Sequence, residues 1–361
     1  MRKKRLYIAL FLVLSLVASC SRPARRQVRI SDFVDEVRLK TTPVKDQGNN
    51  DLCWMYAMLA TIESEHLMIG DSVNLSEDYL ARMYLEEQAR RTYLSRGSSS
   101  ISLRGMGSMA VHLLQTYGGE PYDSYHAKDA VNYRVLSRRL QQMSKSAHTL
   151  DEFNHAMDEI LNDQIEFMPQ IVFMLGAQYT PLEFAHSVCR EGEYVSLTSF
   201  SHHPFGESFM LETPDNVMRD TFENVKIDQL MSYIENALRS GHPVCWEGDI
   251  SEEGFSFQKG TACLRDKDMK VDQEKRQLEF ESLQTTDDHA MELVGIAHDE
   301  HGNKYFIAKN SWGEDNPYNG FMYLSFDYVK LKTIAVFMSR NAMNGKKIQN
   351  DGMRPIGKTD S

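Results

Sequence analysis

Cysteine, histidine and asparagine stand at three separate places in the chain where, together, they could cleave an acyl bond. Cys53 lies between a loop rich in Asn, Asp and Gly and a long apolar stretch, residues 54–69. His289 follows two aspartates, and Asn310 comes shortly afterwards. A thiol nucleophile, an imidazole base and an amide that orients the base are the three parts of a thiol-hydrolase triad. The residue types therefore favour nucleophilic catalysis by Cys53.

The loop before Cys53 predicts a helix that begins near this cysteine. Residues 43–51 contain a Pro, a Gly and several Asn and Asp residues, of which Asn50 or Asp51 can cap a helix. The residues that follow are apolar on nearly all sides, so we expect the helix to be buried in the middle of the domain. A cysteine in its first turn lies at the positive end of the helix dipole, which favours the thiolate. A lone cysteine there is usually a small core residue, and only its partners elsewhere in the chain favour catalysis.

The histidine and the asparagine are expected on a β-hairpin. Residues 283–299 predict a strand that carries His289, residues 299–303 a polar turn, and residues 305–308 the returning strand. Asn310 follows the end of the second strand, so the hairpin can bring the two side chains together.

Several short motifs of the chain resemble those of the papain-like cysteine peptidases. They are Gln47, Cys53-Trp54, Asp288-His289-Ala290 and Asn310-Ser311-Trp312-Gly313. Residues 213–217 and 241–249 resemble segments of the bleomycin hydrolase and aminopeptidase C branch of that family. The resemblance covers about residues 40–343. It implies an α+β, two-lobed papain-like fold, in which a helical lobe carries the cysteine and an antiparallel sheet carries the histidine and the asparagine, with the site in the cleft between them.

The resemblance implies a role for each residue of the site. Cys53 would attack the peptide carbonyl as the thiolate of an ion pair with His289, which would then protonate the leaving amine. Asn310 would fix the tautomer of the imidazole. Gln47 would donate its amide N–H to the oxyanion, together with the backbone N–H of the cysteine. Trp312 would shield the bond between histidine and asparagine from water.

The function that the resemblance implies is an aminopeptidase-like cysteine peptidase that acts on peptides without a metal or an organic cofactor. Trp54, beside the nucleophile, is expected to support the site. The chain departs from the family at Asp51, where the papain-like signature has a glycine; a carboxylate there would crowd the substrate or raise the pKa of Cys53. The alternative is a catalytically silent relative that binds peptides in the same cleft.

The spacing of the motifs indicates an insertion. His289 follows Cys53 by 236 residues, against about 130–150 in simple papain-like enzymes. We expect a peptidase domain at residues 41–343 with a helical insertion at about 120–190. Two helices are expected in the insertion, at residues 131–143 and 150–161. A flexible polar tail is expected at residues 344–361. In the aminopeptidase branch the chain terminus lies in the cleft, so this longer tail leaves exopeptidase and endopeptidase activity both open.

The N-terminus resembles the signal of a bacterial lipoprotein. Residues 2–5 are basic, residues 6–17 are apolar, and small residues lead into Cys20. This implies a signal peptide at residues 1–19, a lipid on Cys20 and a tether at residues 20–40. We therefore expect a protein anchored to a membrane of the bacterial cell envelope, on its periplasmic or outer-membrane face; an ordinary signal peptide is the alternative.

The composition excludes several other classes of protein. The chain has 51 acidic residues against 40 Lys and Arg, a formal net charge of −11, so no nucleic-acid partner is expected. Its 42% hydrophobic and 25% charged residues are ordinary for a globular domain and unlike a disordered or polytopic membrane protein. The oligomeric state and the residue preference stay open.

The remaining cysteines and histidines predict no second site. The cysteines besides those at positions 20 and 53 are Cys189, Cys245 and Cys263. They are too few for a disulfide framework, and the pairing of Cys189 with Cys263 stays open. Cys245 lies in a short apolar strand and is expected to be a buried small residue. The histidines at 202, 203, 298 and 301 lack neighbours at a zinc-like spacing, so we expect loop histidines and no metal site.

Overall fold

The computed structural model describes residues 32–174, 176–266 and 269–348 of the chain. The predicted signal peptide, the lipidation site Cys20, the first part of the predicted tether and residues 349–361 of the predicted tail lie outside the described residues. Among the described residues, no helix combines the length and the apolar character that crossing a bilayer requires.

The chain divides into two units, Met1–Phe33 and Val34–Ser361, and the fold described below is that of the second. Strand β1 (Phe33–Arg38) pairs with β10 (His289–Asp299). The expectation that residues 20–40 form a tether therefore does not hold from the start of β1 onward, because backbone groups of this segment join the sheet.

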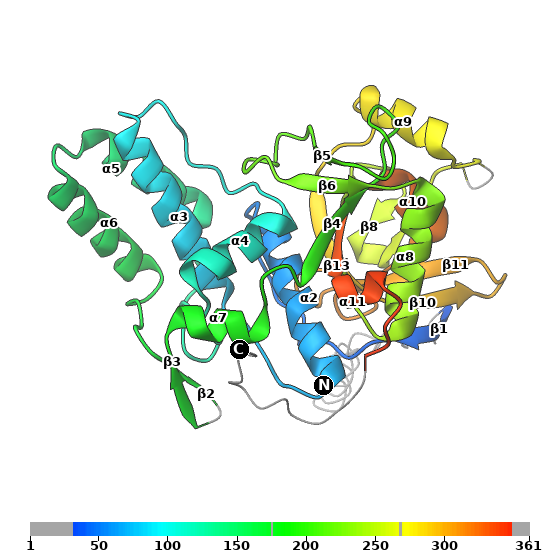
Figure 1. Cartoon of the computed structure of the whole chain (residues 1–361), viewed down its shortest axis with the longest axis horizontal. Helices are drawn as coiled ribbons and strands as arrows, with labels where there is room; N and C mark the ends of the chain where they lie inside the picture. The colour runs from blue at the N-terminus through cyan, green and yellow to red at the C-terminus, as the bar shows by residue number, and fades with distance from the viewer. Residues whose placement is uncertain (1–31, 175, 267–268, 349–361) are drawn as a thin grey trace, which may run out of the picture. The chain divides into compact units, whose positions relative to one another are not determined.

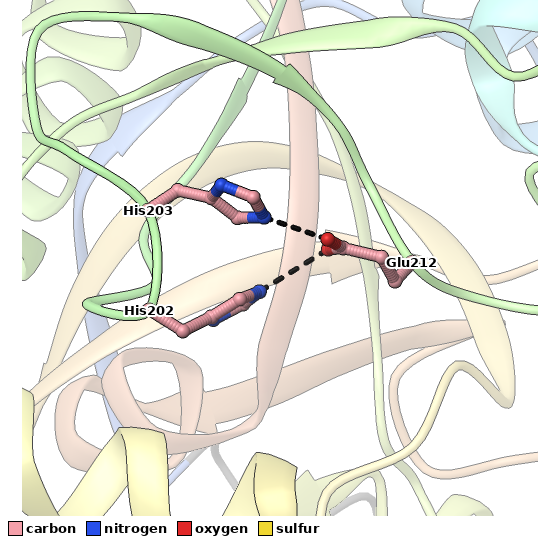
Figure 2. Close-up of side chains that lie close together, drawn as sticks. All are labelled: His202, His203 and Glu212. Carbon is pink, nitrogen blue, oxygen red and sulfur yellow. Dashed lines mark hydrogen bonds and ion pairs between the residues drawn. The ribbon is translucent and has the colours of Figure 1, made fainter.

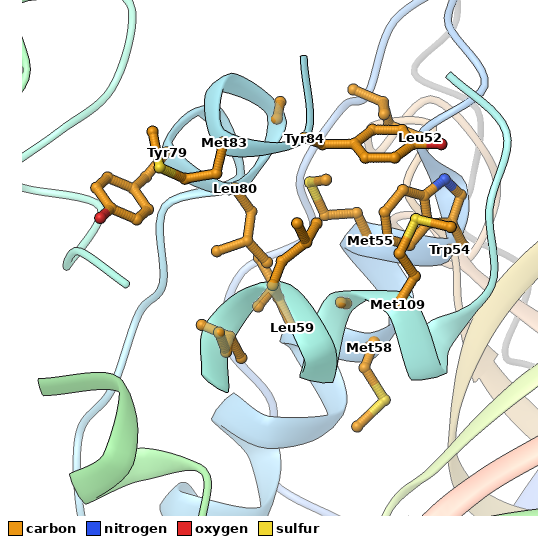
Figure 3. Packing of buried hydrophobic residues seen from close by; sticks show 14 of the residues in the cluster. Leu52, Trp54, Met55, Met58, Leu59, Tyr79, Leu80, Met83, Tyr84 and Met109 are labelled. Carbon is orange, nitrogen blue, oxygen red and sulfur yellow. The ribbon is translucent and has the colours of Figure 1, made fainter. Parts of the chain in front are cut away.

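Helix α2 (Cys53–Ile69) is the central helix of the unit. It packs against β10 and β7 (Val244–Gly248) of the sheet and against helix α4 (Gly107–Tyr117). Its apolar residues lie in the main core together with residues of α3 (Glu77–Leu94), and Figure 3 shows Met55 and Leu59 among them. Burying each such side chain contributes about 1.5–3 kcal/mol. The predicted buried helix is thus confirmed.

The helix begins at the predicted residue but with a different cap. Leu52 occupies the N-cap position, and no side chain caps the helix. The side-chain oxygen of Asn50 instead accepts the backbone N–H of Leu52 at 2.9 Å, which closes a turn before the helix. The prediction that Asn50 or Asp51 caps α2 is therefore wrong, and the first-turn N–H groups beside Cys53 stay free of a side-chain cap.

A group of helices packs on the side of α2 opposite the sheet (Figure 1). Besides α3 and α4 it contains α5 (Tyr133–Ser146), α6 (Leu150–Gln164) and α7 (Pro181–Val188), with a small hairpin of β2 (Val172–Met174) and β3 (Ala177–Tyr179). The helices predicted at 131–143 and 150–161 correspond to α5 and α6. Pro181 is the first residue of α7, and Thr180 and Glu183 form a capping box around it.

The sheet on the other side of α2 has eleven strands within the described part of the chain, and they are mostly antiparallel. Its order is β5-β6-β4-β13-β7-β10-β11-β12-β9-β8, with β1 beside β10. The strands not yet given are β4 (Tyr194–Thr198), β5 (Ser208–Met210), β6 (Thr221–Asn224), β8 (Phe255–Ser256), β9 (Thr261–Ala262), β11 (Lys304–Lys309), β12 (Phe321–Ser325) and β13 (Thr333–Ser339). The pairs β4–β6 and β9–β12 are parallel, so the sheet as a whole is mixed. Strands β10 and β11, which lead into His289 and Asn310, pair antiparallel as predicted. Four helices accompany it: α8 (Ile227–Ser240), α9 (Gln273–Glu281), α10 (Phe326–Lys332) and α11 (Arg340–Met343).

The predicted hairpin is formed by β10 and β11. The two strands pair antiparallel, and Gly302 with a φ of +79° makes the turn between them. The strand does not extend back to residue 283 as predicted, because Leu283 has a left-handed φ of +57° and the residues up to Asp288 form a loop. The loop matters for the site because it leads directly into His289.

Candidate active site

Cys53 and His289 line one cavity with a volume of about 410 Å³. Cys53 is the first residue of α2 and His289 is the first residue of β10, and these two elements pack against each other. Gln47, Trp54 and Trp312 line the same cavity. Five of the predicted site residues therefore line the same cavity. Asn310 does not line it but is hydrogen-bonded to His289, which does.

His289 is held in one orientation by its partner. Its Nε2 forms a 2.8 Å hydrogen bond with Oδ1 of Asn310. The same oxygen accepts the backbone N–H of Ser311 at 2.8 Å, which keeps the amide oxygen turned toward the imidazole. Nε2 therefore carries the proton, and Nδ1 is left to accept a proton from another group.

Trp312 covers this hydrogen bond. Its ring lies 4.6 Å from the imidazole of His289, centroid to centroid, at an angle of 33°. Phe255 and Phe257 pack edge-on against Trp312, with centroids 6.0 and 5.4 Å away. The aromatic group keeps water from His289, which is only 4% exposed.

Burial shifts the thiol and the imidazole toward their neutral forms. It raises the pKa of Cys53 to about 12, although the backbone N–H of Ala290 opposes this shift. The carboxyls of Glu247 and Asp287 raise it further. Burial also lowers the pKa of His289 to about 4, against the effect of its hydrogen bond to the asparagine. The helix dipole alone is thus not enough to make Cys53 a thiolate, because loss of hydration outweighs it.

The amide of Gln47 is fixed by two hydrogen bonds. Its Nε2 donates to the carbonyl oxygen of Asn50 at 2.8 Å, and its Oε1 accepts from the hydroxyl of Ser311 at 2.6 Å. The second amide N–H has no acceptor among the described residues and belongs to a side chain that lines the cavity. Together with the backbone N–H of Cys53, this N–H can receive a negatively charged oxygen.

Trp54 supports the wall of the cavity from behind. Its indole N–H donates to the carbonyl oxygen of Leu103 at 2.9 Å, and its ring packs edge-on against Tyr84. A Cβ on Gly105, which lines the cavity, would lie 2.8 Å from the Trp54 ring. Only glycine therefore lets this wall lie so close to the indole.

Asp51 lies at the edge of the cavity and is paired. Its Oδ1 accepts from Arg134 on α5 at 2.8 Å, and both side chains are about half exposed. The carboxyls that raise the pKa of Cys53 most are Glu247 and Asp287 rather than Asp51. The expectation that Asp51 raises the pKa of Cys53 is therefore corrected: the carboxyls that raise this pKa are those of Glu247 and Asp287.

The sequence analysis missed the charged residues that line the cavity beside the predicted ones: Arg104, Asp215, Glu247 and Asp287. Two of them carry a signal in the sequence. Glu247 is the one charged residue in the otherwise uncharged strand β7, and Asp287 directly precedes the motif that contains His289. Burying a charged side chain in a strand is costly, so such a residue indicates a functional position. Glu247 lines the cavity.

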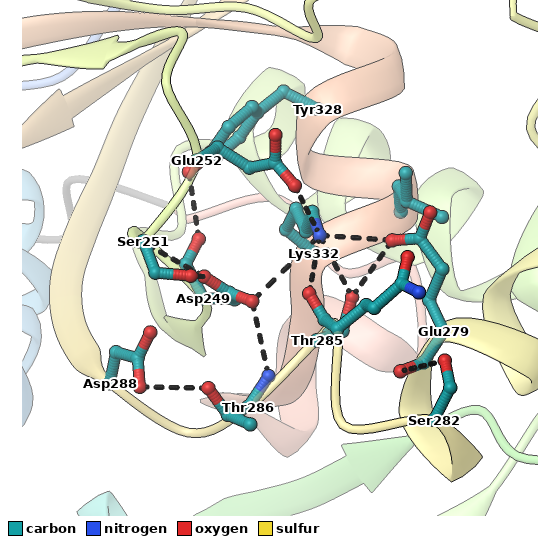
Figure 4. Close-up of polar contacts among 12 residues, drawn as sticks. Asp249, Ser251, Glu252, Glu279, Ser282, Thr285, Thr286, Asp288, Tyr328 and Lys332 are labelled. Atoms are coloured by element: carbon teal, nitrogen blue, oxygen red, sulfur yellow. Dashed lines mark hydrogen bonds and ion pairs between the residues drawn. The ribbon is translucent and has the colours of Figure 1, made fainter.

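A buried lysine holds the loop that leads into His289 (Figure 4). Lys332, at the end of α10, donates to Glu279 at 2.9 Å, to the Gln284 carbonyl at 2.8 Å and to Thr285 at 3.2 Å. It also pairs with Glu252 at 2.6 Å. Lys332 has no exposed surface, so these contacts fix the loop in a water-free environment.

Two histidines predicted as loop residues meet a carboxylate (Figure 2). His202 and His203 place their Nε2 atoms 3.1 and 2.6 Å from the two carboxylate oxygens of Glu212. Among the described residues this is the one group whose ligand atoms lie close enough together to hold a metal ion. The hydrogen bonds already use both carboxylate oxygens, which accounts for the arrangement without an ion.

The four cysteines of the described residues are free thiols: Cys53, Cys189, Cys245 and Cys263. The pairing of Cys189 with Cys263 that the sequence left open is therefore absent from the described structure. Cys245 is fully buried in β7, as predicted.

Comparison with known proteins extends these observations. A family model described as the Peptidase C1-like family matches residues 172–357, slightly more than half of the chain. Aminopeptidase E of Lactobacillus helveticus is 20% identical in a match that covers 87% of this chain and 84% of the relative. Aminopeptidase G of Lactobacillus delbrueckii subsp. lactis is 22% identical, with 82% and 80% covered.

A solved structure has the same fold. The crystal structure of pepw from Lactobacillus rhamnosis superimposes with a TM-score of 0.65 at 18% sequence identity, covering 86% of this chain and 82% of that one. The predicted α+β, papain-like fold is confirmed.

Proposed function

Because the chain belongs to the Peptidase C1-like family and is a cysteine peptidase, we propose that it is an aminopeptidase-like enzyme with a Cys53–His289–Asn310 triad. The observation that carries the proposal is that His289, which is hydrogen-bonded to Asn310 at 2.8 Å, lines the same cavity as Cys53. The names of the two aminopeptidase relatives support the aminopeptidase-like activity. Peptides are the substrates.

In the first step, Cys53 transfers its thiol proton to Nδ1 of His289 as its sulfur attacks the carbonyl carbon of the peptide. Burial disfavours each charge alone, but the transfer creates a thiolate and an imidazolium side by side, and each stabilises the other. Asn310 accepts the Nε2 proton in a hydrogen bond that favours the charged imidazolium. The carbonyl electron pair moves to oxygen, where Gln47 and the Cys53 backbone N–H donate to it.

In the second step, the imidazolium gives its proton to the amine nitrogen as the carbon–nitrogen bond breaks, which leaves a thioester on Cys53. Water then attacks the thioester while His289 takes its proton. The acid product leaves, and the thiol is restored by the same proton. No step requires a metal or an organic cofactor.

We propose further that Cys20 carries a lipid and that the enzyme is anchored in the bacterial cell envelope. The basic residues 2–5, the apolar residues 6–17 and the small residues before Cys20 support this proposal. In this organisation residues 1–19 are the signal peptide, and the peptidase domain includes β1 as well as residues 41–343. Its helical insertion spans about residues 120–190. A Cys20→Ser variant would then lose its partition into the detergent phase, whereas the wild-type protein would keep it.

The test of the catalytic proposal uses protein that starts after Cys20, under reducing conditions, and compares the wild type with Cys53→Ala. Both receive aminoacyl amides with a free N-terminus and matched N-blocked peptides. Cleavage confined to free-amine substrates and abolished in Cys53→Ala supports the aminopeptidase. Cleavage of blocked peptides overturns the aminopeptidase in favour of an endopeptidase. Absence of all cleavage, with Cys53 alkylated no faster than Cys189, overturns the peptidase proposal in favour of the silent peptide binder.

A further inference from the structure

The cavity beside Cys53 contains two buried carboxyl groups that the proposed mechanism does not use. Glu247 is 1% exposed and Asp287 is 9% exposed, yet both line the cavity. In the described part of the structure, Oε2 of Glu247 and Oδ2 of Asp287 have no hydrogen-bond partner. Buried carboxylate oxygens are normally paired, because an unpaired one loses its hydration without gaining a hydrogen bond in return.

Glu247 is held so that one oxygen stays available. Its Oε1 accepts the backbone N–H of Gly107, at the start of α4, at 2.7 Å. On β7 the residue lies directly opposite Ala290 of β10, whose backbone N–H lowers the pKa of Cys53. The carboxyl group is therefore fixed in the wall next to the nucleophile.

The arginine in the cavity wall, Arg104, is paired with a carboxylate other than those of Glu247 and Asp287. Arg104 donates to both carboxylate oxygens of Asp215, at 2.7 and 2.8 Å. It also donates to the backbone oxygen of Asp287 at 2.8 Å, which holds that residue in place without using its carboxyl group. Asp288 adds a further carboxyl to the lining. The wall is thus acidic, and its arginine forms no hydrogen bond with the carboxyl group of Glu247 or of Asp287 among the described residues.

The titration behaviour of these groups agrees with the geometry. Burial, and then the neighbouring Asp287, raise the pKa of Glu247 well above its ordinary value. Burial, and then Asp215, raise the pKa of Asp287 in the same direction, against the effect of Arg104. A cation placed between the two carboxyls would reverse both shifts and supply the missing partner.

We propose that Glu247 and Asp287 form a subsite beside Cys53 that binds a protonated amine or guanidinium group of the substrate. The subsite rests on the proposed peptidase function and specifies its substrate class. The group comes from one of two sources: the side chain of a lysine or arginine near the scissile bond, or the N-terminal ammonium of the peptide. Both offer N–H donors to the two free oxygens.

The test compares kcat/KM for substrate pairs that differ in one charge. The first pair has Arg or the neutral isostere citrulline beside the scissile bond, both with a blocked N-terminus. The second pair has neutral side chains and a free or blocked N-terminus. The enzymes are the wild type, Glu247→Gln, Asp287→Asn, the double variant and Glu159→Gln. Glu247→Gln keeps an oxygen for Gly107, and Glu159→Gln is a control on α6, where that side chain is 69% exposed.

We expect the wild type and Glu159→Gln to prefer the charged member of at least one pair by about 10- to 100-fold, the range for a charge-assisted hydrogen bond. Each single variant should lower this preference, and the double variant should abolish it while still cleaving the neutral substrates. Preference within the first pair identifies a side chain as the source, and preference within the second identifies the N-terminal ammonium. Equal cleavage of both pairs by the wild type, or an unchanged preference in the double variant, overturns the subsite and leaves the peptidase function intact.

Binding separates the two proposals if no substrate is turned over. In the Cys53→Ala background, the Arg peptide and its citrulline analogue are titrated calorimetrically into protein with and without the double substitution. Tighter binding of the Arg peptide that the double substitution removes supports the subsite even where catalysis fails. Equal affinity for the two peptides overturns it.

Discussion

Exclusion of water sets the pKa values of the reactive residues in this site. His289 is 4% exposed, is covered by Trp312 and has an Nε2 proton committed to Asn310. Its environment therefore favours the neutral imidazole, with Nδ1 available as the base. Two measurable properties follow, one concerning pH and one concerning the tautomer.

The first prediction concerns the acid limit of activity. Burial lowers the pKa of His289 to about 4, so the imidazole stays unprotonated at mildly acidic pH. It becomes protonated, and can no longer act as the base, only when the pH falls below about 4. We expect kcat/KM for an uncharged substrate to fall by half near pH 4. A half-loss near the ordinary histidine pKa of about 6.5 would contradict the assignment. Circular dichroism across the same pH range controls for acid unfolding.

The second prediction concerns Asn310. Asn310→Ala removes the acceptor of the Nε2 proton, so the imidazole can rotate or change tautomer, and we expect kcat to fall about 10²-fold with a small change in KM. Asn310→Asp keeps an oxygen for both His289 and the Ser311 N–H and should retain more activity than the alanine variant. Equal activity of the alanine variant and the wild type would exclude the orienting role.

At the scale of elements, the loop of residues 283–288 before β10 fixes the position of His289. The loop has no regular backbone pairing of its own, and buried polar contacts hold it instead. Lys332 of α10 joins it to Glu279 of α9 through contacts of 2.8 to 3.2 Å. A residue that does not line the cavity therefore fixes the position of the catalytic base.

The third prediction tests this role of Lys332. Lys332→Met leaves Asp249 buried without its cation and leaves Glu279 with Lys275 as its one remaining partner cation among the described residues. Breaking such a buried group costs about 3–5 kcal/mol of unfolding free energy. We expect denaturant unfolding to show this loss, and kcat to fall because the loop is released. Lys330→Met is the matched control on the same helix, since its partner Asp228 is 84% exposed, and its cost should stay below about 1 kcal/mol. Equal costs for the two variants would contradict the argument.

At the scale of the whole folded unit, α2 joins the helical side to the sheet from one end to the other. Its first residue carries the thiol, while Glu65 in its last turns is bound to His242, which precedes β7, at 2.7 Å. The other ring nitrogen of His242 lies 2.8 Å from the backbone oxygen of Lys346, so the described end of the chain is held at the same place. The buried histidine links three segments that are far apart in the sequence.

The fourth prediction concerns stability and pH. Burial lowers the pKa of His242, but the bonds to Glu65 and to the Lys346 carbonyl outweigh burial and raise it above its ordinary value. A raised folded-state pKa means that the stabilisation is complete below about pH 6.5 and is lost as pH rises through the folded-state value. We expect the wild type to lose more unfolding free energy than Glu65→Gln between about pH 6 and pH 9. Parallel losses would contradict the linkage.

Features that depend on neighbours in the chain could be predicted from the sequence. The start of α2 at Cys53, helices α5 and α6 and the hairpin turn at Gly302 follow from breakers, periodic apolar residues and turn residues that act over a few positions. The motifs around Cys53 and His289 likewise carried the resemblance to the peptidase family. These signals are local, so they can be recognised before the chain is folded.

Features that depend on burial and on contacts between distant residues could be found only in the folded protein. Folding brought Glu247 and Asp287 to the cavity, and it raised the pKa of Cys53 where the helix dipole alone predicted a thiolate. It also joined β1 to the sheet and gave Asp51 a partner in Arg134. Desolvation and Coulomb effects sum over atoms from many segments, and no pattern along the chain encodes that sum.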